Sequence, residues 1–251
     1  MSVPGAAPAL AVATLLAWRG TLDLGPDWAV WRGSVGDTSM HRHFAAQAVL
    51  CDGPLSMIDF DGVSHVGRDF LIEPLVAHRL LPAAQATIVF IEPRRLPAAS
   101  LPDDIDRALR AAAQRARPLP GPTPEGDDFW STWLVSRPPA GAMSAAEAWE
   151  HTVRAAIDEQ LGNGRLGLAD VARRVHLSAE RFRHVFAARI GMPFRRFVLW
   201  RRLRRAALAM QAGTDVTTAA HHAGFADAAH FARTLRSSFG VSANQSLRRR
   251  D

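Results

Sequence analysis

The sequence predicts a protein of two domains: an N-terminal β-barrel and a C-terminal all-α domain with two helix-turn-helix motifs. The first observation is a series of short apolar runs, separated by glycine, aspartate and proline, between residues 20 and 95. The second is a helical pattern that occurs twice between residues 168 and 250, and the third is a proline-rich stretch between these regions. A chain of 251 residues can build two cores. We place the domains at 1–117 and 144–251, with a linker at 118–143.

The N-terminal apolar runs have the length of buried strands. They cover residues 28–33, 47–53, 55–62, 70–76 and 86–93. Short runs with turn residues about every ten positions are typical of a β-barrel or sandwich.

A helix is expected over residues 102–116, directly after the strands. Asp103 and Asp104 suit the positive end of a helix, and alanines and arginines continue it. Its thin apolar seam would pack either on the barrel or on a second protomer, and consists of Ile105, Leu109 and Ala112.

Residues 118–128 contain four prolines and two glycines, which exclude regular structure and favour an extended spacer. A helix at 145–161 then opens the C-terminal domain, because Ser144 and Glu147 form a capping box.

The same two-helix pattern occurs twice in the C-terminal domain. In the first copy, residues 168–191, a short helix precedes Ser178, which caps the next helix. In the second copy, residues 216–240, Gly224 ends the first helix and Asp227 caps the next. The second helices have apolar stripes of Phe182, Phe186 and Ile190 in one copy and Phe231, Leu235 and Phe239 in the other. Each copy therefore has one buried face and one free face.

A long helix over residues 193–210 joins the two copies rigidly. Its apolar stripe includes Phe194, Phe197, Leu203 and Met210. Six arginines cover the rest of its surface: Arg195, Arg196, Arg201, Arg202, Arg204 and Arg205.

Charge is unevenly distributed along the chain. Residues 145–251 contain 18 arginines and 9 acidic residues, a net charge of +9, whereas the remaining residues carry 12 basic and 15 acidic side chains, or −3. A basic C-terminal half behind an acidic N-terminal half is expected of a sensor joined to a polyanion-binding domain.

The C-terminal region resembles the DNA-binding domain of the AraC/XylS family of bacterial transcription regulators. The resemblance covers roughly the last hundred residues, and its most specific part is the spacing from Gly224-Phe225 to Phe239-Gly240. Ala243 stands where the family has proline, and Ser246-Leu247 where it has an aromatic residue. The resemblance implies double-stranded DNA, an effector, a second copy of the chain and RNA polymerase as partners.

In a helix-turn-helix motif, the second helix enters the major groove. The side chains expected to reach base edges, by periodicity and by the resemblance, are Glu180, Arg183, His184, Ala228, Ala229, His230 and Arg233. Arg183 and Arg233 suit guanine, and Glu180 suits cytosine. The alternative is a solvated charged face, but the two matching copies favour DNA.

Other arginines are expected to contact phosphates, which adds affinity without sequence information. They are Arg173, Arg174, Arg195, Arg202, Arg236 and Arg248 to Arg250. Two motifs on a rigid helix should reach major-groove faces about one helical turn, ~34 Å, apart.

A group of histidines is the informative feature of the N-terminal half. On a strand, His41, His43 and Gln47 would point to one face, and His78 follows a hairpin or two later. This arrangement resembles the histidine pattern of cupins, although Gln47 stands where metal-binding cupins usually have glutamate. The resemblance implies a cupin-like barrel, and three imidazoles suit Zn, Ni, Cu or Fe(II). The alternative is that these residues line an effector pocket or simply pack there.

The leading interpretation is a sequence-specific transcription regulator, not an enzyme, that senses a small molecule or a metal. The alternatives are a metal-dependent cupin enzyme with a basic DNA-binding domain, and an architectural protein that reads only DNA shape. Ser/His/Asp ordering, glycine-rich phosphate loops and CxxC pairs are absent from the sequence. The single cysteine, Cys51, fits a reducing cytosol, and no segment is apolar enough to span a membrane, so we expect a cytoplasmic protein.

Overall fold

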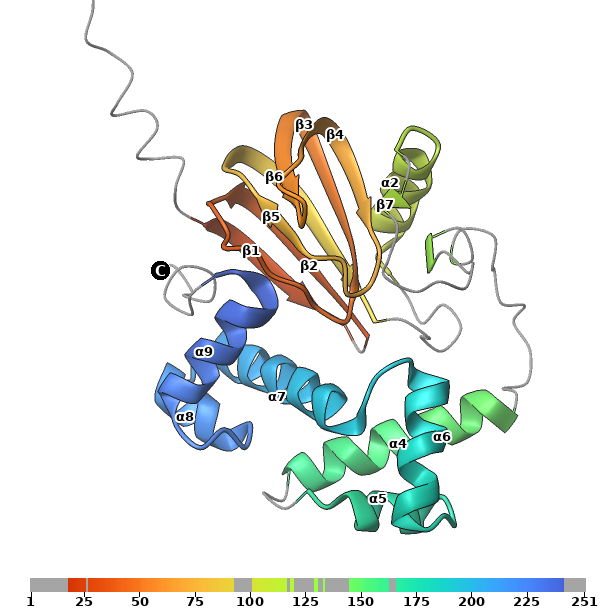
Figure 1. Ribbon diagram of the computed structural model, residues 1–251. Coiled ribbons are helices and arrows are strands. Elements are labelled where there is room, and N and C mark those ends of the chain that lie inside the picture. The colour runs from red at the N-terminus through yellow and green to blue at the C-terminus, as the bar shows by residue number, and fades with distance from the viewer. Residues whose placement is uncertain are drawn as a thin grey trace, which may run out of the picture.

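The computed structural model describes residues 18–25, 27–92, 101–116, 118–119, 129–130, 133, 145–162 and 166–241. A β-sheet forms most of the N-terminal part, and helices form the C-terminal part (Figure 1). The predicted fold class, a β-rich domain followed by an all-α domain, is confirmed.

One curved sheet contains all the described strands. They are β1 (Arg19–Leu24), β2 (Trp28–Val35), β3 (Ala46–Asp59), β4 (Ser64–Ile72), β5 (His78–Leu80), β6 (Ala83–Ile91) and β7 (Pro118–Leu119). The order is β1-β2-β6-β3-β4-β7, with β5 beside β3, and every pair except β4 with β7 is antiparallel. Among the described strands, these pairings form an open path, so the predicted barrel is a curved sheet with two edges. The register of β3 against β4 shifts between Leu50 and Leu55.

Strand periodicity divides the sheet's side chains between two cores. Val30 and Ala48 belong to one core, and their neighbours Trp31 and Val49 belong to the other. Helix α2 (Asp103–Ala113) covers the first face with the predicted seam, in which Ile105, Leu109 and Ala112 are buried. Of the two alternatives for this seam, packing on the sheet is the one observed.

Part of the predicted linker packs on the N-terminal domain. Strand β7 pairs in parallel with β4. Trp130 is fully buried, and its indole Nε1 donates a hydrogen bond to the carbonyl oxygen of Ile72 at 3.1 Å. Residues 120–128 and the predicted Ser144 cap lie outside the described residues.

The described residues from 145 onward form six helices: α4 (Ala145–Gly162), α5 (Leu168–Arg174), α6 (Ala179–Ile190), α7 (Phe194–Gln211), α8 (Val216–His222) and α9 (Ala228–Phe239). The predicted caps at Ser178 and Asp227 are confirmed. Ser178 Oγ accepts from the backbone N–H of Arg181, and Asp227 accepts from that of His230. Gly224 has φ +82°, as expected for the residue that ends α8.

Helix α7 runs beneath the sheet and connects two helical clusters (Figure 1). Phe194 and Phe197 join the core of α4, α5 and α6, whereas Leu203 and Met210 join that of α8 and α9. The sheet therefore lies against the helix that sets the spacing between the two motifs.

Candidate functional site

Helix α6 has a buried face and an exposed face, as predicted. Phe182, Phe186 and Ile190 are buried. Glu180, Arg183 and His184, which were predicted to reach DNA bases, are all exposed. The three polar side chains are therefore available to a ligand.

Helix α9 presents a similar face. Ala229, Arg233 and Arg236 are exposed, and Ala228 is half-buried. His230 is also half-buried, and its ring packs edge-on against Phe225 at 5.3 Å between centroids. This histidine is partly engaged in the turn of its own motif, so Arg233 is the better placed of the predicted polar contacts.

The arginines of α7 do not form one free basic surface. Arg195 and Arg196 are exposed, but Arg201 is buried and Arg204 is half-buried. Arg202, predicted to contact phosphate, is also half-buried, and burial lowers its pKa. The expectation of a polar outer surface fails for these residues because that side of α7 faces neighbouring parts of the fold.

Two predicted phosphate contacts of the first motif are exposed and form surface ion pairs. Arg173 pairs with Asp170, and Arg174 pairs with Glu159 at 3.0 Å. Such pairs are weak and exchange readily for a phosphate partner. Arg248 to Arg250 lie outside the described residues.

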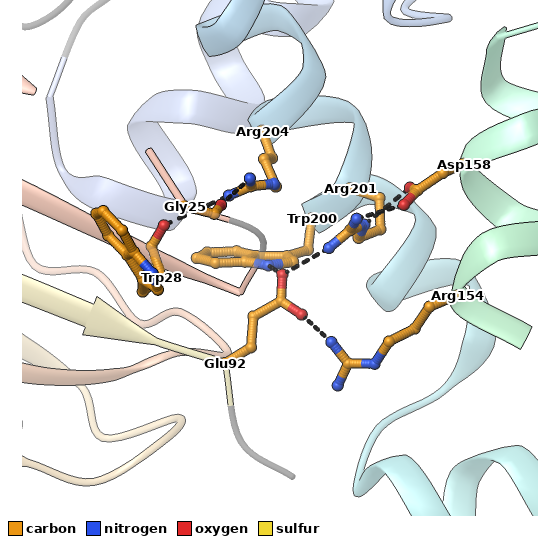
Figure 2. Close-up of polar contacts among 8 residues, drawn as sticks. All are labelled: Gly25, Trp28, Glu92, Arg154, Asp158, Trp200, Arg201 and Arg204. Carbon is orange, nitrogen blue, oxygen red and sulfur yellow. Dashed lines mark hydrogen bonds and ion pairs between the residues drawn. The ribbon is translucent and has the colours of Figure 1, made fainter. Parts of the chain in front are cut away.

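A buried ionic cluster joins the sheet to the helical domain (Figure 2). The Glu92 carboxylate, directly after β6, accepts from Arg201 at 3.0 Å and from the Trp200 indole at 2.7 Å, and it pairs with Arg154. Arg201 also pairs with Asp158 of α4. Burial raises the pKa of Glu92, but the charges of Arg201 and Arg154 outweigh it and lower the pKa overall.

Arg204 makes a second contact between the domains. Its guanidinium donates to the backbone carbonyl oxygens of Gly25 and Trp28 (Figure 2). Burial, together with repulsion from Arg201, lowers the pKa of Arg204. Sequence reasoning missed both contacts, because Glu92 and Arg201 are 109 positions apart. The sequence feature that indicated a buried charge was Glu92, an acidic residue directly after the apolar run 86–91.

The structure brings the predicted histidine group together. His41, His43 and His78 are buried, and one ring nitrogen from each lies within 4.8 Å of the others. Gln47 Oε1 lies 2.6 Å from His43 Nε2 and 3.0 Å from His78 Nε2. The expectation of a continuous strand is wrong: His41 forms an isolated bridge with His78, and β3 begins only at Ala46, after a bend.

The donor set of this cluster fits a transition metal. Each Nδ1 lies 2.8–3.0 Å from a backbone carbonyl oxygen, those of Ser39, Ala45 and Val76. A carbonyl oxygen accepts, so these contacts favour a proton on Nδ1 and leave Nε2 as the nitrogen that binds a metal. The Nε2 atoms of His43 and His78 face Gln47 Oε1, so a metal would lie between them and this oxygen. Burial, with the charge of His43, lowers the pKa of His41 to about 3. Burial also lowers the pKa of His43 and His78, which favours the neutral form of the ring that metals require.

A cavity of about 120 Å³ adjoins the histidines, between the sheet and helices α7 and α9. His41 and Gln47 line it, together with apolar side chains that include Trp31, Phe90 and Leu235. Apolar cavities of this size bind small ring compounds (about 150 Å³ for benzene). An organic effector, the alternative to a metal, would therefore have a binding site beside the histidines.

Within the described residues, no helix is long and apolar enough to cross a bilayer.

Residues 171–249 match the family model of a helix-turn-helix domain. Over 93 residues the chain is 34% identical to the transcriptional activator RhrA of Rhizobium meliloti (strain 1021), a match that covers 36% of this chain and 29% of RhrA. The chain thus matches less than a third of this curated relative.

Solved structures of ToxT from Vibrio cholerae share the fold over most of both chains. ToxT of strain O395 has a TM-score of 0.51 and 12% identity, covering 87% of this chain and 96% of that one. An apo ToxT variant of strain SCE256 gives 0.51 and 12%, with 88% and 96% covered. The likeness establishes a shared two-domain arrangement.

Proposed function

We propose that this chain, whose C-terminal domain is a helix-turn-helix domain of the AraC type, is a cytoplasmic, sequence-specific transcription regulator with an effector-sensing N-terminal domain. The observation that carries the proposal is the pair of capped helices, α6 and α9, each with a buried, mainly apolar face and an exposed polar face. Helix α7 fixes their separation, so one chain would read two segments of one DNA site.

Arg183 on α6 and Arg233 on α9 are the proposed guanine contacts. Glu180, His184, Ala228, Ala229 and His230 are proposed to contribute further base contacts. Arg195 and Arg236 are proposed to bind phosphate, because both side chains are exposed.

The test is binding-site selection from random DNA, followed by titration of Arg233→Ala and Arg236→Ala. The two arginines lie one turn apart on α9 and are both exposed, so each variant is the control for the other. Arg233→Ala should cost about 1–3 kcal/mol on the selected site only, and relax one base position. Arg236→Ala should weaken selected and random DNA alike. Equal losses for Arg233→Ala on both DNAs would contradict base reading.

We also propose that His41, His43 and His78, with Gln47 as a fourth ligand, hold a divalent transition metal. The support is three buried rings whose Nδ1 atoms face backbone carbonyl oxygens, and a Gln47 oxygen that lies on the Nε2 atoms of His43 and His78. Metal analysis of the purified chain and of His41→Ala and His43→Ala tests this assignment. Stoichiometric metal that both variants lose supports it, and metal-free protein after incubation with Zn²⁺ would contradict it.

A sensor role suits this location better than catalysis, because the histidines lie against the helical domain. We propose that the C-terminal domain spans 144–251 and that the N-terminal domain extends beyond residue 117, because β7 and Trp130 pack on it. A second copy of the chain and RNA polymerase are proposed as further partners, and sedimentation with and without DNA tests the first of these.

A further inference from the structure

The end of the second reading helix lies directly on the histidine cluster. The Phe239 ring, the last residue of α9, stacks on the His43 ring with 5.6 Å between centroids and 29° between planes. Phe239 also packs against Phe90 of the sheet and Trp200 of α7. One aromatic side chain thus joins the histidine site, the sheet and both helices.

The next residue, Gly240, makes an even closer approach. Its carbonyl oxygen accepts from the backbone N–H of Ser39 at 3.1 Å. A Cβ at Gly240 would lie 2.6 Å from the Ser39 carbonyl oxygen and 2.8 Å from His41 Nδ1. Gly240 also has φ +69°, which favours glycine. The helix end therefore reaches the histidine loop through a contact that leaves no space for a side chain.

Hydrogen bonds through Ser39 link α9 to His41. Ser39 N–H donates to Gly240, and His41 Nδ1 lies 2.9 Å from the Ser39 carbonyl oxygen. A cation on His41 Nε2 would strengthen the Nδ1–H donor. In addition, α9 points its C-terminus, the negative end of its dipole, toward the site, and cations are stabilised there.

Metal binding would also draw the rings together. Tetrahedral coordination with Zn–N bonds near 2.1 Å places ligand nitrogens about 3.4 Å apart. The ring nitrogens here lie within 4.8 Å of one another. Because the Phe239 ring stacks on the His43 ring, the position of Phe239 depends on the positions of the histidine rings.

We propose that a divalent metal on the histidine cluster fastens α9 to the N-terminal domain, so that metal binding and the placement of the second reading helix are coupled. The coupling rests on the proposed metal site, and it gives the proposed regulator a route from sensor to DNA. Coupling is reciprocal: if metal binding strengthens the contact between α9 and the N-terminal domain by some factor, that contact strengthens metal binding by the same factor. A substitution that removes the contact should therefore weaken metal binding.

The test uses Co²⁺ as the probe, titrated by its visible absorption into the full chain, Phe239→Leu and Phe225→Leu. Phe225 is the matched control, because it lies in the same motif and packs edge-on against His230 and Phe231 instead. We expect Phe239→Leu to weaken Co²⁺ binding about fivefold or more, and Phe225→Leu to leave it unchanged. Equal affinities in all three proteins, or no Co²⁺ binding by the unsubstituted chain, would overturn the proposal.

Hydrogen exchange of residues 228–241 in the unsubstituted chain decides the matter if Phe239→Leu does not fold. Co²⁺ should slow exchange there, and His43→Ala should abolish the slowing. Unchanged exchange on Co²⁺ binding would refute the coupling. If the coupling is present but the chain selects no DNA sequence, the regulator function fails while the coupling stands.

Discussion

Replacing Glu92 with glutamine tests the ionic cluster between the domains. The carboxylate is 1% exposed and pairs with both Arg154 and Arg201, so solvent screens these interactions little. Removing one partner of a buried ion pair typically costs about 3–5 kcal/mol, because the remaining charges stay buried. For a chain of this size, that loss lowers Tm by roughly 6–20 °C.

Thermal and urea unfolding measure this loss, with Asp23→Asn as the control. Asp23 pairs with Arg32 on the surface, where its side chain is 55% exposed, and such pairs contribute only about 0–1 kcal/mol. The pKa of Glu92 is lowered in the fold, so its contribution is present above pH 4.5 and is lost as pH falls through the lowered value. The gap between wild type and Glu92→Gln should therefore be full at pH 7 and shrink below pH 4.5. A Glu92→Gln loss no greater than that of Asp23→Asn would refute this account of the cluster.

Three further predictions follow from the helical domain. Ser178→Ala and Asp227→Ala each remove a helix cap and should lower stability by about 1 kcal/mol, measured by urea unfolding, whereas unchanged midpoints would contradict the assigned caps. Gly240→Ala should increase protease cleavage between the domains, because its Cβ would meet Ser39 and His41; unchanged cleavage would contradict this close contact. A fragment of residues 142–251 should bind the selected DNA with an affinity that does not depend on metal. If the DNA affinity of the full chain is equally independent of metal, the N-terminal domain does not regulate DNA binding.

Local sequence signals predicted the helical domain well. Ser178, Gly224 and Asp227 act on the residues immediately around them, and the aromatic stripes repeat with the helical period. Such features can be assigned without knowing the rest of the fold.

Features that depend on distant residues were harder to predict. The α7 arginines have the pattern of a solvated face, yet Arg201 is buried because Glu92, from the other domain, neutralises it. Trp130 was assigned to a linker because prolines surround it, although its own apolar side chain favoured burial. The histidines themselves indicated a possible metal site. Their proximity depends on the backbone bridge between His41 and His78, which joins two separate segments of the chain.

Methylation interference on the selected site tests the central claim most directly, because it reports guanine N7 contacts in the major groove. The account predicts two groups of interfering guanines on the same side of the duplex, about one helical turn or ~34 Å apart. Arg183→Ala should remove interference in one group, and Arg233→Ala should remove it in the other. A single group, or interference that neither substitution changes, would contradict the reading of DNA by α6 and α9.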